Sequence, residues 1–497
     1  MRTRRLSLAA ALLVLLSLTA TPARAATGAQ VLLVCNQACP AGTQFSTIQS
    51  AVNAAHPGDW VLVWPGDYHE DGPVAGVYVT TPGLHLRGLD RNRVIVDGTR
   101  PGASRACTDD AAFQGTPGRN GIEVYKAAGV YVENLTVCNY LATTGGQGGN
   151  QVWWNFGDGS GVAVPGTWWG NYLSTTSTYW GGSAAPMGMY GLFVSNSDGP
   201  GSMSYGYASN MGDSGVYVGA CADCNAVLSH LHVENNALGF SGTNAGGHLV
   251  IESSEWDLNR SGIVPNSLNN DDAPPPQDGR CPGSATKICT LIRNNYVHDN
   301  NNPNVPGFGI AASGAVGAGI ELAGASYNNV YGNRVENEGS WGVIVHDLPD
   351  TETPPPVSHC QGGVQLPGAC DFISKGNLVH DNVFRHNGGF GNPSNGDLGN
   401  QSTADPGNCF YGNTDTAGPL TSDPPDIQSS PVDGPPCGRP NAGDDAVLGP
   451  QLVCATGIAG PCPGYPQQTQ VQMLPLAPQA GMPNPCAGVP ANPWCRG

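Results

Sequence analysis

The chain is poor in lysine, in charged residues of any kind and, after its first segment, in long apolar runs. Only 12% of its 497 residues are charged, and lysine occurs only at Lys126, Lys287 and Lys375. No stretch beyond residue 25 approaches the roughly 20 apolar residues that a membrane-spanning helix needs. The formal net charge of −18 repels nucleic acid and anionic membranes. We expect a monomer that neither inserts into a membrane nor binds nucleic acid.

The first 25 residues differ from the rest of the chain. Arginines at positions 2, 4 and 5 precede an apolar run over residues 6–18, and the sequence Ala-Arg-Ala ends the segment. This order is typical of a secretory signal peptide, which is removed on export. The sequence therefore predicts residues 1–25 as a signal peptide and the mature protein as secreted and extracellular.

Sixteen cysteines, an even number, fit an oxidising compartment. Spacing alone leaves the connectivity open, and the simplest pairing joins each cysteine to its neighbour in sequence. Such local bridges would hold loops in place rather than build the core. The expected pairs are Cys35–Cys39, Cys107–Cys138, Cys221–Cys224, Cys281–Cys289, Cys360–Cys370, Cys409–Cys437, Cys454–Cys462 and Cys486–Cys495.

A glycine recurs at a spacing of about 23 residues through the middle of the chain, with one longer gap, and an apolar residue follows each glycine. This period is too short for a propeller blade and is typical of one coil of a parallel β-helix. The apolar residues would stack as an inward column of the core, so an all-β solenoid is predicted. The glycines are Gly191, Gly215, Gly239, Gly262, Gly319 and Gly342, and the residues after them are Leu192, Val216, Phe240, Ile263, Ile320 and Val343.

Asparagine ends several of these repeats, nine residues after a strand begins. An asparagine amide can bond to its counterpart one coil away, so a repeated turn selects it. Successive strand residues point to opposite faces, so an apolar offset should face inward and its ionisable neighbour outward. The asparagines are Asn236, Asn259, Asn300 and Asn387, the inward residues Val233, Trp256, Val297 and Phe384, and the outward residues Glu234, Asp257, His298 and Arg385.

The repeat pattern divides the chain into a solenoid and a tail. We expect residues 26–390 to form the β-helix domain and residues 391–497 to form a Pro-, Gly- and Cys-rich tail of loops or extended cover. Ile48, Val52 and Ala55 have helical spacing. They predict a short helix that caps the open end of the solenoid.

Long loop insertions should interrupt the coils at about residues 145–187, 265–289 and 346–375. The second and third leave at nearly the same point of their coils, so we expect them to form walls of one groove. The first insertion is rich in tryptophan, whose faces stack well on sugar rings. We predict that these tryptophans bind substrate, and the alternative is that they pack on the flank of the helix. They are Trp153, Trp154, Trp168, Trp169 and Trp180.

The opening FSTIQSAVNAAHPGDWVLVWPGDY and the glycine-led coils resemble the secreted right-handed parallel β-helix repeat proteins of the pectate-lyase-like class. The likeness covers roughly residues 30 to 390. Segments such as SGVYVGAC and SGIVPNSLNNDDAP are similar to an actinobacterial branch of that family. The resemblance implies a right-handed β-helix, secretion, and action on polysaccharides by a lyase, hydrolase or epimerase. A shared fold does not identify the reaction.

The outward ionisable column adjoins a second outward column two residues earlier on each strand. Aligned coils would bring these side chains about 4.8 Å apart, forming a candidate active site on an exposed face. The alternative is an ordinary solvated face of mixed charge. The candidates here are the catalytic residues Glu234, Glu255, Asp257, His298 and Arg334 and the substrate-binding residue Tyr296.

Two chemistries could use these groups. Hydrolysis needs two carboxyl groups about 5 to 9.5 Å apart. Elimination from a uronate needs a base, here Arg334 or His298, and often calcium, which Asp271 and Asp272 could hold. The cofactor stays open, with calcium as the candidate. We favour hydrolysis because the protein is acidic and lysine is scarce.

His346 and Asp347 are further catalytic candidates, because they stand where the third insertion leaves the solenoid and would line the groove. A surface turn is the alternative for this pair. The sequence thus predicts a secreted enzyme that cleaves a polysaccharide bound along a groove. A non-catalytic glycan-binding or cell-surface scaffold is the alternative function.

Overall fold

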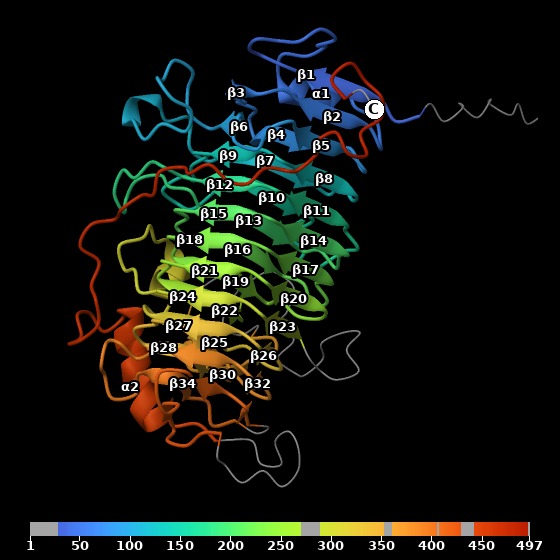
Figure 1. Ribbon diagram of the computed structural model, residues 1–497. Coiled ribbons are helices and arrows are strands. Elements are labelled where there is room, and N and C mark those ends of the chain that lie inside the picture. The colour runs from blue at the N-terminus through green and yellow to red at the C-terminus, as the bar shows by residue number, and fades with distance from the viewer. Residues whose placement is uncertain (1–27, 270–288, 352–359, 405–406, 429–441, 496–497) are drawn as a thin grey trace, which may run out of the picture.

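The computed structural model describes residues 28–269, 289–351, 360–404, 407–428 and 442–495. Three long parallel sheets of 12, 11 and 11 strands run side by side along one axis, and each coil of the chain contributes a strand to each sheet (Figure 1). The protein is a right-handed parallel β-helix, as predicted.

We call the sheets 1, 2 and 3 in the order in which a coil visits them. Sheet 1 contains β1 (Val31–Val34), β2 (Trp60–Val63), β5 (His85–Gly88), β8 (Val130–Glu133), β11 (Trp168–Asn171), β14 (Gly201–Ser204), β17 (Ala226–Ser229), β20 (Leu249–Glu252), β23 (Thr290–Arg293), β26 (Asn329–Tyr331), β32 (Leu378–His380) and β35 (Cys409–Tyr411). Sheet 2 contains β3 (Gly66–Tyr68), β6 (Val94–Asp97), β9 (Thr136–Cys138), β12 (Ser174–Thr176), β15 (Tyr207–Ser209), β18 (His232–Glu234), β21 (Glu255–Asp257), β24 (Tyr296–His298), β27 (Arg334–Glu336), β33 (Val383–Arg385) and β36 (Thr414–Asp415). Sheet 3 contains β4 (Ala75–Val79), β7 (Asn120–Tyr125), β10 (Val152–Asn155), β13 (Tyr190–Ser195), β16 (Ser214–Gly219), β19 (Leu238–Thr243), β22 (Ser261–Asn266), β25 (Ala318–Ala323), β28 (Trp341–His346), β34 (Gly396–Asn400) and β37 (Ser422–Asp423).

The glycine-led segments are strands of sheet 3, and the predicted register is confirmed. Leu192 pairs with Val216, and the column continues residue by residue to Val343. Every member of the column is fully buried. Burial of one such side chain contributes about 1.5–3 kcal/mol, so a stacked apolar column fixes the register of the whole sheet.

The asparagine column is also confirmed, as a ladder of side-chain amides inside the turn between sheets 2 and 3. Asn236 Nδ2 donates to Asn259 Oδ1 at 2.9 Å, and Asn259 Nδ2 donates to Asn300 Oδ1 at 2.9 Å. The next rung is Glu338, whose backbone N–H donates to Asn387 Oδ1 at 3.0 Å. The ladder pairs buried turn groups that water does not reach.

The predicted capping helix is α1 (Ile48–Ala54), which covers the first coil (Figure 1). Ile48, Ala51 and Val52 are buried against the solenoid. Glu70 receives the otherwise unpaired N–H groups at the start of the helix, with Ile48 N to Oε1 at 2.5 Å and Gln49 N to Oε2 at 3.3 Å. An acidic side chain at this end also suits the helix dipole.

Residues 145–187 depart from the prediction of an insertion. They contain β10, β11 and β12, one strand in each sheet, and therefore form a complete coil. Trp154 and Trp168 fill the core of this coil. The large indoles replace the aliphatic residues of the other coils, which hides the repeat in the sequence.

The other two insertions leave from sheet 3, after β22 and β28, as predicted for walls on the same side. The second insertion lies outside the described residues at 270–288, and the third forms a small antiparallel sheet of β29 (Leu348–Asp350), β30 (Val364–Leu366) and β31 (Ala369–Phe372). The two walls are joined, because Asn269 N donates to Asp350 Oδ2 at 2.6 Å.

The C-terminal region holds more structure than the predicted tail. β34 completes the coil of β32 and β33, one further coil is made by β35, β36 and β37, and α2 (Asp445–Thr456) follows. Leu448 and Leu452 of α2 pack on Trp341 and Ile344 of sheet 3. Two short 3₁₀ helices, η1 (Ala111–Phe113) and η2 (Gly309–Ser313), lie in loops. Within the described ranges, neither α-helix has the length and apolar composition that a bilayer crossing needs.

After α2 the chain runs back along the solenoid to the first coil, as the red segment of Figure 1 shows. We call residues 468–495 the strap. Turn asparagines hold it through two-way side-chain bonds: Asn210 donates to Leu474 O and accepts from Leu474 N, each at 2.9 Å. Asn92 bonds to Gln479 in the same two ways at 2.8 Å. The predicted extended cover is thus a segment held by specific hydrogen bonds.

The structure confirms the disulfides whose two cysteines are both described. They are Cys35–Cys39, Cys107–Cys138, Cys221–Cys224, Cys360–Cys370, Cys454–Cys462 and Cys486–Cys495. The expected partners of Cys289 and Cys409, and the expected signal peptide, lie outside the described residues.

Candidate active site

The structure places the predicted ionisable columns together on the outer face of sheet 2. His232 Nε2 lies 3.0 Å from Asp257 Oδ1, and His298 Nε2 lies 3.3 Å from Glu255 Oε1. Burial opposes the charge of His232, but the hydrogen bond and charge of Asp257 outweigh it and raise the pKa of His232. The register that brings these acids and imidazoles together was predicted.

The same face pairs its remaining predicted members. Arg334 Nε donates to Glu336 Oε1 at 2.6 Å, and its guanidinium lies 4.6 Å above the Tyr296 ring. Glu234 Oε1 accepts from Tyr207 at 2.7 Å. The groups therefore form separate ion pairs and hydrogen bonds on adjacent strands. A cavity of about 500 Å³ beside them is lined by His232, Glu255, Tyr296 and the strap.

The predicted tryptophans do not lie on one surface. Trp154 and Trp168 are fully buried in the core, so the prediction that they bind substrate is wrong. Trp169 stacks on Tyr131 along sheet 1, and Trp180 is half-buried. Trp153 faces outward on sheet 3 and stacks on Phe193, with ring centroids 4.9 Å apart. The predicted metal ligands Asp271 and Asp272 lie outside the described residues.

Two adjoining cavities of about 390 and 620 Å³ lie on the outer face of sheet 3. They share η2, Glu321 and Leu348 in their walls, so they form one groove along several coils. Concave sites of this size that combine apolar and polar groups are the usual location of ligand binding. We call this the sheet-3 groove.

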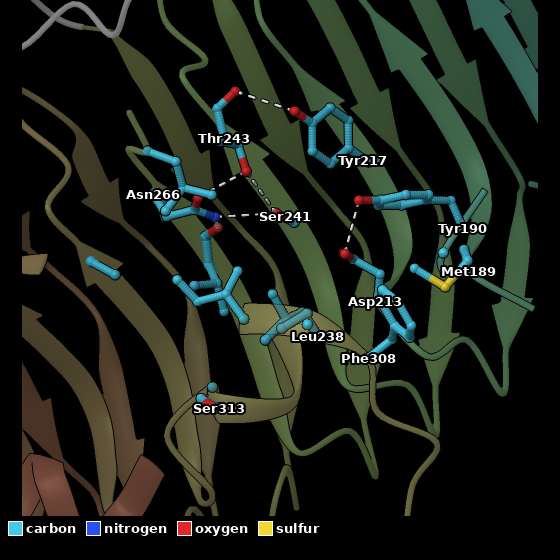
Figure 2. Close-up of a pocket in the computed structure, with 18 of the residues that line it drawn as sticks. Met189, Tyr190, Asp213, Tyr217, Leu238, Ser241, Thr243, Asn266, Phe308 and Ser313 are labelled. Carbon is cyan, nitrogen blue, oxygen red and sulfur yellow. Dashed lines mark hydrogen bonds between the residues drawn. The ribbon is translucent and has the colours of Figure 1, made fainter. Parts of the chain in front are cut away.

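The first half of the groove is aromatic (Figure 2). Tyr190, Phe193, Tyr217 and Phe308 line it, and Tyr190 donates to Asp213 Oδ2 at 2.8 Å. A polar rim, made of Ser241, Thr243 and Asn266, lies on the next strands, where Asn266 bonds to Ser241 at 3.1 Å and to Thr243 at 2.8 Å. Flat rings beside hydroxyl and amide groups suit the apolar faces and hydroxyls of a sugar.

The second half of the groove contains a buried carboxylate and imidazole. His346 Nε2 lies 3.1 Å from Glu321 Oε1, and the other oxygen of Glu321 accepts from Ser261 Oγ at 2.7 Å and Ala315 N at 3.1 Å. Burial alone would raise the pKa of Glu321, but the hydrogen bond and charge of His346 lower it. Burial alone would lower the pKa of His346, but Glu321 raises it. Each member of the pair therefore favours the charged form of the other.

The pKa of Asp347, next to this pair, is shifted in the opposite direction to that of Glu321. Its burial raises the pKa, and the hydrogen bond that Ser374 N donates to Oδ1 at 2.8 Å only partly offsets the effect. Asp347 and Glu321 line the same cavity. Two carboxyl groups whose surroundings push their pKa values apart are typical of an acid and a base in one site.

Sequence reasoning found His346 and Asp347 but missed Glu321. The position that pairs with Glu321 on the neighbouring strand β28 carries no ionisable side chain, because it is Ile344. Glu321 therefore belongs to no column of ionisable residues. Only the register of β25 and β28 shows that this acid lies beside His346. The aromatic residues of the groove were also missed, although Trp153, Phe193 and Tyr217 pair in register on successive strands and form a column that could have shown them.

No family model and no curated protein matches the chain. Solved structures with a similar arrangement include the A-module of mannuronan C-5 epimerase AlgE4 from Azotobacter vinelandii, at 12% identity and a TM-score of 0.45 over 74% of this chain and 90% of that one. A PL6 family polysaccharide lyase from Pseudopedobacter saltans is similar at 13% identity and 0.41 over 80% and 90%. The GH136 lacto-N-biosidase from Eubacterium ramulus is similar at 12% identity and 0.37 over 78% and 68%. Likenesses this distant carry no argument about function.

Proposed function

We propose that the protein is a secreted polysaccharide hydrolase whose substrate lies along the sheet-3 groove. The observation that carries this proposal is the pair of carboxyl groups Glu321 and Asp347, with oppositely shifted pKa values in one cavity. Asp347 is the acid that protonates the leaving oxygen, and Glu321 is the carboxylate that activates water. His346 holds Glu321 in its ionised form.

The spacing of the two acids supports this assignment. His346 pairs with Ala323 across the strands, so Asp347 stands one strand and about three residues from Glu321. Strand geometry then puts their Cα atoms roughly 11 Å apart. Side chains that face one cavity from that spacing can bring their carboxyl groups to the roughly 6.5–9.5 Å of inverting hydrolases, which leave room for a water.

The lining of the groove favours a neutral sugar over a uronate. None of the described residues that line its two cavities is a lysine or an arginine. A sugar carboxylate would therefore meet the carboxylates of Glu321 and Asp213, and His346 is the one group of this lining that could offset the repulsion. Elimination from a uronate, which requires neutralisation of that carboxylate, is disfavoured.

A panel of neutral and uronic polysaccharides tests the proposal. We expect new reducing ends from a neutral polysaccharide, with no absorbance from unsaturated products and no loss on adding a chelator. Unsaturated products would instead establish a lyase. Binding without any product would establish the glycan-binding scaffold.

A further inference from the structure

Asp67, His69 and Asp97 form a cluster in the first two coils, far along the axis from the sheet-3 groove (Figure 1). Asp67 lies in β3, His69 just after it, and Asp97 at the end of β6, the neighbouring strand of sheet 2. One potential ligand atom from each residue lies within 4.8 Å of the others. Asp67 Oδ2 and His69 Nε2 are 3.3 Å apart.

The His69 ring is oriented as in a metal ligand. Its Nδ1 lies 2.7 Å from Thr99 O, and since a carbonyl only accepts, Nδ1 carries the hydrogen. In the neutral ring the lone pair is then on Nε2, which faces the carboxylates. Histidines that bind metals usually donate their second N–H to a carbonyl or carboxylate in this way.

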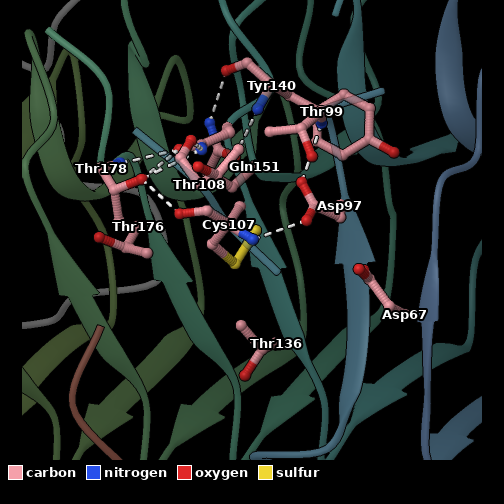
Figure 3. The surroundings of a disulfide bond; sticks show 12 residues. Asp67, Asp97, Thr99, Cys107, Thr108, Thr136, Tyr140, Gln151, Thr176 and Thr178 are labelled. Atoms are coloured by element: carbon pink, nitrogen blue, oxygen red, sulfur yellow. Dashed lines mark hydrogen bonds between the residues drawn. A yellow bond between two sulfur atoms is a disulfide. The ribbon is translucent and has the colours of Figure 1, made fainter. Parts of the chain in front are cut away.

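Asp67 supplies a second, independent observation. Its Oδ1 is buried and has no hydrogen-bond partner among the described residues. Thr99, which is 4% exposed, lies beside the Asp97 carboxylate, and its hydroxyl interacts with that group (Figure 3). Buried polar atoms are nearly always satisfied, so an unpaired carboxylate oxygen that belongs to this cluster points to a bound ion.

The cluster is held firmly. Asp97 Oδ1 accepts from Thr99 N at 2.8 Å and its Oδ2 accepts from Cys107 N at 2.6 Å, and Cys107 is bonded to Cys138 of the next strand (Figure 3). Each carboxylate oxygen keeps a lone pair for a further partner. The sulfurs are committed to the disulfide and are not available as ligands.

We propose that Asp67, His69 and Asp97 bind a divalent cation, with Zn²⁺ preferred over Ca²⁺ and Mg²⁺. Imidazole with two carboxylates suits Zn²⁺, whereas the harder ions prefer oxygen ligands alone. A tetrahedral ion with bonds of about 2.1 Å places its ligand atoms roughly 3.4 Å apart, which matches the Asp67 to His69 spacing. The ion ties the first coil to the second beside the capping helix.

Calorimetric titration and thermal melting of the full chain, stripped with a chelator, test this inference. We expect ZnCl₂ to bind and raise the melting temperature, with CaCl₂ and MgCl₂ weaker. His69→Gln and Asp67→Asn should each weaken this binding by at least about tenfold. His386→Gln, at an exposed histidine, is the control and should bind as the wild type does.

Both substitutions change partly exposed side chains. The melting temperatures of the metal-free variants should therefore equal that of the metal-free control. X-ray absorption of the zinc complex adds a readout independent of stability, and we expect nitrogen and oxygen neighbours with no sulfur. The inference is overturned if Zn²⁺ fails to bind the stripped wild type, if His69→Gln binds it equally, or if Ca²⁺ binds more tightly.

Discussion

Glu338 takes the place of an asparagine in the turn ladder: its Oε1 accepts from Asn300 Nδ2 at 2.8 Å and its Oε2 from Asn300 N at 3.0 Å. Complete burial raises the pKa of Glu338 to about 8. The folded protein therefore keeps a proton that the unfolded chain releases above pH of about 4.3. Stability should fall as pH rises from there to about 8, by at most about 1.4 kcal/mol per pH unit from this group.

Glu338→Gln should remove this loss. The amide keeps a carbonyl acceptor for Asn300 and has no charge to bury, so we expect a higher melting temperature than the wild type at pH 8 and a flatter profile between pH 5 and 8 by calorimetry. Glu336→Gln is the control two residues away. The ion pair with Arg334 lowers the pKa of Glu336. The stability that Glu336 contributes is therefore lost only as pH falls through that lowered pKa. Equal profiles for Glu338→Gln and the wild type would contradict the prediction.

In the sheet-3 groove, Glu321→Gln and Asp347→Asn should each lower kcat/KM by about 10²–10⁴-fold. The wild-type profile should be bell-shaped. Activity falls at high pH as Asp347 loses its proton above its raised pKa, and at low pH as Glu321 gains one below its lowered pKa.

Glu255→Gln on sheet 2 is the matched control for these two variants, because Glu255 bonds to His298 on the predicted face. We expect it to leave kcat/KM nearly unchanged. If Glu255→Gln lost most of its kcat/KM while the two groove variants kept near-normal values, the active site would lie at the ionisable columns of sheet 2.

Substitutions of the neighbouring residues Trp153 and Trp154 should have different effects, the first on oligosaccharide binding and the second on stability. Trp153 supports Phe193 at the edge of the groove, so Trp153→Ala should weaken oligosaccharide binding about three- to tenfold with a small change in melting temperature. Trp154 is fully buried, so Trp154→Ala should cost about 3–5 kcal/mol of unfolding free energy. Titration calorimetry and denaturant unfolding measure the two effects, and a reversed outcome would contradict the assignment of faces.

Asn210→Ala should loosen the strap. The change removes both bonds to Leu474 together with the side-chain bonds to Thr176 and Asn235, and we expect a loss of about 1–3 kcal/mol and, from the strap bonds, faster protease cleavage within residues 468–495. Asn225→Ala is the control, since Asn225 has the same left-handed backbone (φ 43° against 67°) and an exposed side chain. If both variants cleave at the same rate, the strap is held by other contacts.

The sequence predicted the coils that repeat one another. Gly191 through Gly342 and the asparagine turns recur because equivalent side chains stack between coils. Their spacing in the sequence therefore gives the register of the strands. The coil at 152–176 was missed because Trp154 and Trp168 stand where aliphatic residues would reveal a repeat.

Glu321 and the strap lacked a periodic signal. Glu321 faces His346 across one strand pair only, and nothing at the paired position Ile344 shows that an acid lies beside it. The strap bonds through its backbone to asparagines such as Asn92 and Asn210, so its own side chains carry no pattern. Contacts between segments several hundred residues apart become visible only once the solenoid is built.

The strap also bears on how the molecule comes apart. Solenoids contact only their nearest neighbours, so their terminal repeats ordinarily fray one after another. Here Trp494 lies against Trp64 in the first coil, with ring centroids 5.3 Å apart, while the same segment begins beside α2, which packs on β25 and β28 of sheet 3. Opening of the first coil therefore frees one end of a segment whose other end lies beside α2, so we expect the coils between these two points to melt together.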